Sequence, residues 1–102
     1  MAGIDRAFDN LKLCDEAGWT TPPGHPDLVP AREALLLSEG FREAARNLSG
    51  DYDERFSAWL AESEGTAAAL ETAVKSGDAD ESTKLLARSS TLCQQCHRAY
   101  RD

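Results

Sequence analysis

Apolar residues recur every three or four positions along most of this chain, the spacing of one face of an α-helix. Prolines and glycines interrupt the pattern between residues 18 and 30, and single glycines end it again at positions 50 and 77. The pattern therefore predicts four helices, at about residues 2–17, 27–48, 51–77 and 78–100. No segment alternates between apolar and polar residues as a half-buried strand would.

Residues suited to helix ends mark these boundaries. Gly18 is a stop signal for the first helix, and the second begins at Asp27 as N-cap or at Pro30 in the first turn. Asp51 followed by Glu54 has the spacing of a capping box. Gly77 stops the third helix, and Asp78 or Asp80 caps the fourth.

One stripe of each helix is expected to face a common core. The expected buried residues are Ile4, Phe8, Leu11 and Cys14 or Asp15 in the first helix; Ala31, Ala34, Leu35, Phe41, Ala45 and Leu48 in the second; Phe56, Trp59, Leu60, Ser63, Ala67, Leu70 and Val74 in the third; and Leu85, Leu86, Ser89, Leu92, Cys93, Cys96 and Tyr100 in the fourth. Short connections make neighbouring helices antiparallel. The prediction is an all-α, up-down-up-down four-helix bundle that forms one domain over residues 1–102.

The charge of the chain limits its partners. Its net charge is -7 over 102 residues, so it would repel nucleic acid and anionic membrane surfaces. The longest apolar run, residues 34–37, is far too short to insert into a bilayer. No paired carboxylates, Ser-His-Asp arrangement or glycine-rich phosphate loop is present, so the sequence does not support an enzyme of hydrolase or nucleotide chemistry.

Two of the three cysteines and one of the two histidines lie within five residues near the end of the chain, in TLCQQCHRAYRD. On a helix, with Cys93 at 0°, Cys96 falls at about -60° and His97 at about +40°, so the three share an arc of roughly 100°. The arc continues the apolar stripe. Whatever these residues bind is expected inside the bundle or at its mouth.

Three chemistries use two thiols and an imidazole at this spacing. In covalent haem attachment, Cys93 and Cys96 would form thioether bonds and His97 would be an axial iron ligand. Structural zinc needs four ligands, and only Cys14 and His25 remain to complete the set, at unconvincing spacing. A redox disulfide of the thioredoxin type would begin a helix beside a strand rather than end one. Haem is the interpretation that fits the helical context.

From Phe56 onward, FSAWLAESEGTAAALETAVKSGDADESTKLLARSSTLCQQCHRAYRD resembles the cytochrome c′ family, the class II c-type cytochromes. The resemblance covers about the last half of the chain, with a GD turn before the last helix and Cys-x-x-Cys-His followed by Tyr-Arg. It implies haem c held between helices, Cys93 and Cys96 as attachment points, His97 as the proximal iron ligand and Arg101 near the proximal haem face. Arg101 could equally stabilise the C-terminal end of its helix.

The first helix departs from the family pattern, because the early part that covers the distal haem face is expected to be missing. Met1, His25 and Cys14 are poor sixth ligands, so the iron is expected to be five-coordinate or open. Cys14 is expected to be a small buried residue and His25 a solvated loop residue. Trp59 is expected in the core or against the ring, and Trp19 at the bundle end.

Two functional classes remain open. The first is a periplasmic haem c protein that transfers electrons to a redox partner protein or binds a small gas such as NO or CO. No export signal is visible in MAGIDRAFDN, so either the chain is cytosolic or an export segment has been removed. A copy made without the haem-attachment machinery would lack the group. The second class is a cofactor-free helical interaction module with buried or disulfide-bonded cysteines. The resemblance also implies a homodimer through the first two helices.

Overall fold

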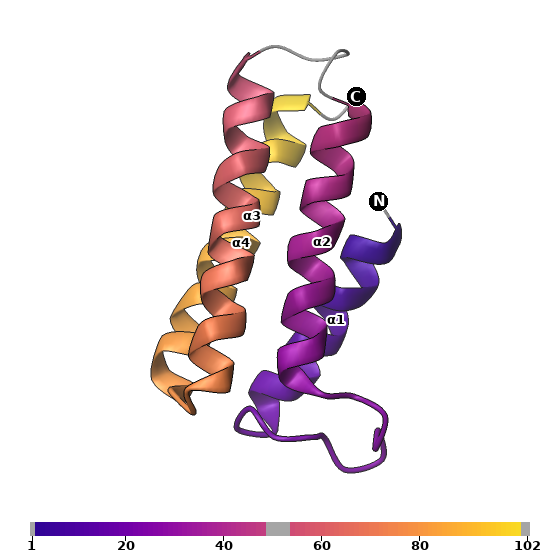
Figure 1. Cartoon of the computed structure of the whole chain (residues 1–102), viewed down its shortest axis with the longest axis vertical. Coiled ribbons are helices and arrows are strands. Elements are labelled where there is room, and N and C mark those ends of the chain that lie inside the picture. The colour runs from indigo at the N-terminus through magenta and orange to yellow at the C-terminus, as the bar shows by residue number, and fades with distance from the viewer. Residues whose placement is uncertain (1, 49–53, 101–102) are drawn as a thin grey trace.

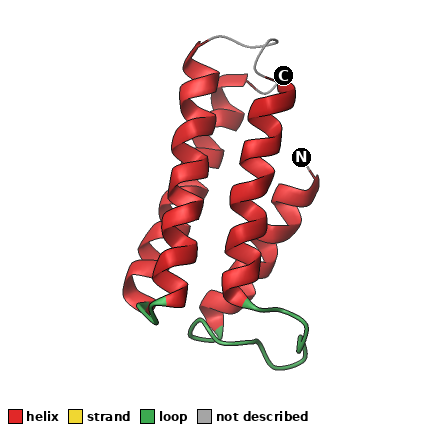
Figure 2. Ribbon diagram, in the orientation of Figure 1, coloured by secondary structure: helices red, strands yellow, loops and turns green. Residues whose placement is uncertain are grey.

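The structure is a computed structural model that describes residues 2–48 and 54–100. Its elements are α1 (Ala2–Glu16), α2 (Pro30–Leu48), α3 (Glu54–Lys75) and α4 (Ala79–Tyr100). They run alternately up and down and form the predicted antiparallel four-helix bundle (Figure 1). All regular structure in the described ranges is helical (Figure 2). In these ranges no helix combines the length and apolar character needed to cross a membrane.

Glycines end α1 and α3 in the same way. Gly18 has φ +71° and Gly77 has φ +77°, values that glycine adopts without the steric cost a side chain brings. After α1, the Gly18 N–H donates to the Asp15 carbonyl at 3.0 Å and the Trp19 N–H to the Cys14 carbonyl at 2.7 Å. This pair of bonds is a Schellman motif, and Gly77 and residue 78 repeat it after α3. Both predicted stop signals are confirmed.

The starts of α2 and α4 each match one of the two alternatives predicted from the sequence. The Asp78 carboxylate accepts the backbone N–H of Glu81 at 3.0 Å, which confirms it as the N-cap of α4. α2 begins at Pro30, and its first carbonyl acceptor is that of Val29. Asp27 therefore lies too far upstream to cap α2, and that alternative was wrong. The expected cap Asp51 lies outside the described residues.

The core agrees with the predicted stripes in α1, α3 and most of α4. On α2 one expectation was wrong: Leu35 is 40% exposed, whereas Leu37 is fully buried. A helix turns by about 100° per residue, so Ala34, Leu37 and Phe41 share the inner face and Leu35 faces away from it. Ala31, Ala45, Trp59, Val74, Leu85 and Cys93 are half-buried, and the Leu48, Cys96 and Tyr100 side chains lie outside the described part.

The helices pack unequally around the bundle. α1 lies along α2, α2 along α3 and α3 along α4, whereas α1 and α4 meet only over a short stretch. One such link is a polar chain beyond the end of α1: the Trp19 indole N–H donates to the Thr83 hydroxyl at 3.0 Å, and Thr83 donates to the Asp15 carboxylate at 2.9 Å. Trp19 therefore covers this end of the bundle, as predicted. Away from that link, the edge between α1 and α4 leaves room for a cavity.

Candidate functional site

Residues 93–97 lie within α4, so the helical placement predicted for the Cys-x-x-Cys-His motif is confirmed. Cys93 is half-buried and packs against the hydrophobic core. The side chains of Cys96 and His97 and the whole of Arg101 lie outside the described residues. Their predicted roles stay predictions, and the site is built below from the residues around Cys93.

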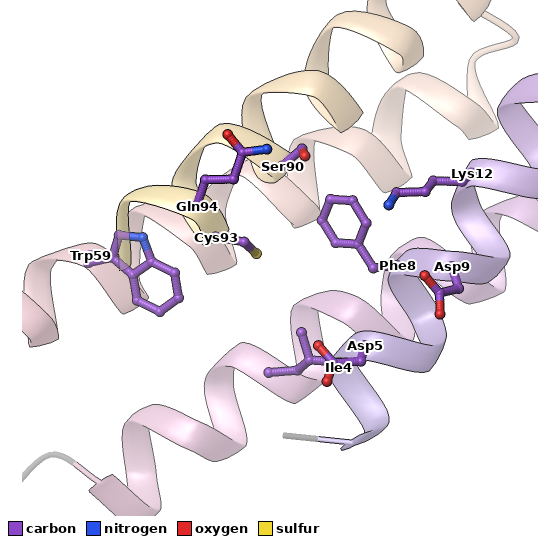
Figure 3. Close-up of a pocket in the computed structure, with 9 residues that line it drawn as sticks. All are labelled: Ile4, Asp5, Phe8, Asp9, Lys12, Trp59, Ser90, Cys93 and Gln94. Carbon is purple, nitrogen blue, oxygen red and sulfur yellow. The ribbon is translucent and has the colours of Figure 1, made fainter. Parts of the chain in front are cut away.

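Cys93 faces a cavity of about 370 Å³ between α1, α3 and α4. In Figure 3 its sulfur points across this cavity toward Phe8 of α1. The cavity is lined by Ile4, Asp5, Phe8, Asp9, Lys12, Trp59, Ser90, Cys93 and Gln94. This volume lies within the range of about 300–1,000 Å³ that is typical of small-molecule and cofactor sites. The motif predicted to carry chemistry thus adjoins a hollow of the size of a ligand site.

The inner wall of the cavity is apolar and its rim is charged. Ile4 and Phe8 are buried on α1, one helical turn apart, and face the α4 side. Asp5 and Asp9 repeat the same spacing on the exposed flank of α1. The Lys12 ammonium lies 5.4 Å from the centre of the Phe8 ring, a cation–π distance. A ligand would therefore have apolar contacts inside and meet mostly carboxylates at the mouth.

Ile4 and Phe8 of α1 form the wall of the cavity opposite Cys93 (Figure 3). This face of the cavity is therefore covered by two apolar side chains. The expectations that the early part of the first helix is missing and that the distal haem face is open stay predictions. No sequence motif marked this wall. The signal that could have indicated it is the pair Asp5 and Asp9, which flank Ile4 and Phe8 at the same step of four residues.

Trp59 of α3 joins the cavity to the backbone of α4. Its indole N–H donates to the Leu92 carbonyl at 2.5 Å, directly before Cys93. Its ring stacks on Phe56 with centroids 5.9 Å apart and meets Phe41 edge-on at 5.8 Å. Two aromatic contacts and one hydrogen bond fix the indole beside the cavity. Trp59 packs against the core, as predicted, and also lines the cavity. Its predicted contact with a haem ring stays a prediction.

The other two candidate ligands lie elsewhere. Cys14 is fully buried, as predicted, and burial raises the pKa of its thiol, with a further contribution from the nearby Glu33 carboxylate. Glu33 is itself buried and accepts the Asn10 side-chain amide at 2.8 Å. Neither Cys14 nor Glu33 lines the cavity beside Cys93. A thiol held neutral in this way is a poor metal ligand and a poor nucleophile.

His25 is exposed, as predicted for a solvated loop residue. It lies in the loop 17–29, at the end of the bundle away from the two chain termini (Figure 1). There it lines a separate hollow with Leu13 and Pro22. Within the described residues no three His, Cys, Asp or Glu side chains come close enough to hold a metal ion. The structure therefore does not bring Cys14 and His25 to Cys93.

Comparisons of the chain with protein-family models, with curated proteins and with solved structures gave no significant match.

Proposed function

We propose that this chain is a c-type haem protein that binds haem c covalently through Cys93 and Cys96, with His97 as the axial iron ligand. The observation that carries the proposal is the cavity in front of Cys93. Cys93 lies on α4, the helix that contains the whole Cys-x-x-Cys-His motif. The motif supplies two thiols for thioether bonds and an imidazole for iron. In this proposal the ring would lie in the cavity.

The residues around the cavity suit a flat apolar ring. Ile4, Phe8 and Trp59 present aliphatic and aromatic surface, which gains free energy when it covers another apolar surface. At about 370 Å³ the cavity lies toward the lower end of the usual range for ligand sites. Its edge lies between α1 and α4, the neighbouring helices with least mutual contact, so this edge is where the bundle can widen with least loss of packing.

Several of the lining residues have a role in this proposal. When bound, haem c supplies an iron centre that changes redox state or binds a small gas. Trp59, Ile4 and Phe8 exclude water from the ring, and Trp59 also holds the backbone before Cys93 through its bond to Leu92. Lys12 is the one cation among the described lining residues and could pair with an anionic group at the edge of the haem. Arg101 is proposed to lie near the proximal face.

Whether the iron would transfer electrons or bind a gas depends on whether a protein side chain is available as a second axial ligand, opposite His97. The described lining residues from α1 and α3 include no histidine, methionine or cysteine. An open iron position therefore fits this set better than a sixth protein ligand. This favours binding of NO or CO over pure electron transfer, and both uses belong to the periplasm, where haem c is attached. Redox exchange with a partner protein is the remaining use in this class.

The test is to express the chain with an export signal and a haem-attachment system, and to measure haem that survives denaturation. The parent is compared with the double variant Cys93→Ala, Cys96→Ala and with Cys14→Ala, which removes a cysteine outside the cavity. We expect covalent haem in the parent and in Cys14→Ala, and none in the double variant. The reduced parent should be high-spin and change its spectrum with CO.

Two results would contradict the proposal. Equal covalent haem in the parent and the double variant would exclude attachment at these thiols. A parent without any haem would favour a cofactor-free helical module instead. One observation supports that second candidate: Leu11, Leu37, Leu60 and Leu70 are already fully buried by the chain alone. A low-spin ferrous spectrum unaffected by CO would keep the haem but move the protein to the electron carriers.

A further inference from the structure

Gly40 lies in the middle of α2, where glycine weakens a helix. The reason for a glycine there is the neighbouring helix. A Cβ atom at position 40 would lie 2.7 Å from Cγ1 of Ile4 and 3.5 Å from its Cδ1. The first distance is shorter than real Cβ contacts allow, so α1 approaches the α2 backbone more closely than an alanine would permit.

Ile4 has two neighbours at once. One side of its side chain lies over Gly40, and another lines the cavity beside Cys93. It is buried, and its branched Cβ leaves few alternative rotamers. A methyl group at position 40 would push Ile4 away from α2. The open space next to Ile4 is the cavity, so the displaced side chain would occupy part of it.

We infer that Gly40 is a positioning residue that sets the size of the cavity by letting Ile4 lie against the backbone of α2. It would thereby limit how bulky a ligand the cavity admits. This inference relies on the proposed function only for the identity of the natural ligand. The seating of Ile4 is a property of the protein without haem and can be tested there.

The chain offers a matched control and an unambiguous reporter. Gly65 is also an interior helical glycine, on α3, but a Cβ there would meet no atom within 4 Å. Ile4 is the one isoleucine of the sequence. Labelling isoleucine δ1 methyl groups therefore gives a single methyl signal in the NMR spectrum, and that signal comes from the cavity wall.

The experiment titrates haem-free protein with benzene as a small apolar probe and follows the Ile4 methyl signal. In the parent we expect the probe to shift this signal. In Gly40→Ala we expect the signal to differ before any probe is added, and the affinity for benzene to fall about tenfold, the usual effect of about one methyl group in an apolar pocket. Gly65→Ala should behave as the parent.

A second variant separates cavity size from general damage. Adding Ile4→Ala to Gly40→Ala removes the clashing carbon, so benzene binding, followed through the probe's own NMR signal, should return to at least the parent affinity. The inference is overturned if Gly40→Ala leaves both the Ile4 methyl signal and the affinity for benzene unchanged. It is also overturned if the double variant binds benzene no more tightly than Gly40→Ala does, or if the parent does not bind benzene. A failure of covalent haem attachment would leave all three readouts intact.

Discussion

At the scale of single residues, Cys14 shows how burial alone decides the chemistry of a thiol. It is fully buried on α1, one turn from Asn10, whose amide holds the buried Glu33 of α2. An apolar setting disfavours the thiolate, and the adjacent carboxylate disfavours it further, so the pKa of Cys14 is raised. Cys14 thus acts as a small apolar residue of the core, whereas Cys93 lines the cavity.

The raised pKa of Cys14 predicts a loss of stability at alkaline pH. In the unfolded chain a cysteine loses its proton near pH 8.5, whereas in the fold it keeps the proton to a higher pH. The contribution is therefore complete below about pH 8.5 and declines as the pH rises through the folded pKa. Cys14→Ala should lower the free energy of unfolding by about 1 kcal/mol at pH 7. The difference should shrink toward pH 10.

Urea unfolding of the parent and Cys14→Ala at several pH values between 7 and 10 measures this. Taking the difference between the two proteins removes the titration of the other cysteines and the lysines. A difference that stays constant over this range would show that Cys14 ionises equally well in both states.

At the scale of elements, the helix ends were easier to predict than the faces. Gly18, Gly77 and Asp78 act within a few residues of themselves, so their effect can be read from local sequence. The inner face of α2 depends instead on which other helix it meets. In the run from Ala34 to Leu37 every residue is apolar, so periodicity alone cannot choose between Leu35 and Leu37. Packing against α1 and α3 makes that choice.

The cap of α4 gives a prediction at this scale. Asp78→Ala removes the acceptor of the Glu81 N–H and should lower the free energy of unfolding by about 1 kcal/mol. Asp80→Ala deletes a carboxylate from the first turn without removing the acceptor of the Glu81 N–H, and should cost only a few tenths of a kcal/mol through the helix dipole. Thermal or urea unfolding compares the two variants. If both variants lose the same free energy of unfolding, the carboxylates act at the N-terminal end of α4 through their charge alone and not through a capping hydrogen bond.

At the scale of the whole molecule, the core is closed without a cofactor. The radius of gyration is 13.5 Å, close to the value of about 13 Å expected for a compact domain of this length. The core cluster contains residues from all four helices, among them Leu11, Phe41, Leu60 and Leu86. The cavity beside Cys93 lies at the edge of this core, between α1 and α4.

We therefore predict that haem-free protein stays helical. Circular dichroism should show a helical spectrum and a cooperative thermal transition, with the midpoint raised once haem is attached, because a group that binds only the folded state stabilises it. The double variant Cys93→Ala, Cys96→Ala provides haem-free protein from the same expression system. A random-coil spectrum for it would contradict the prediction.

The fold class and the place of the motif on α4 could be predicted because both follow from periodicity in one stretch of chain. The cavity could not. It depends on the separation of α1 and α4, which are brought together mainly through their packing on α2 and α3. The close approach of Ile4 to Gly40 is equally invisible in the sequence, where Gly40 has the same context as any helical glycine.

The two main walls of the cavity come from segments far apart in the sequence. Residues 4–12 form one wall and residues 90–94 another, with Trp59 between them. A molecule in which only α2 and α3 have formed their hairpin has no such wall pair. A ligand bound there would therefore contact α1 and α4 at once and hold these two helices together, although they contact each other only over a short stretch.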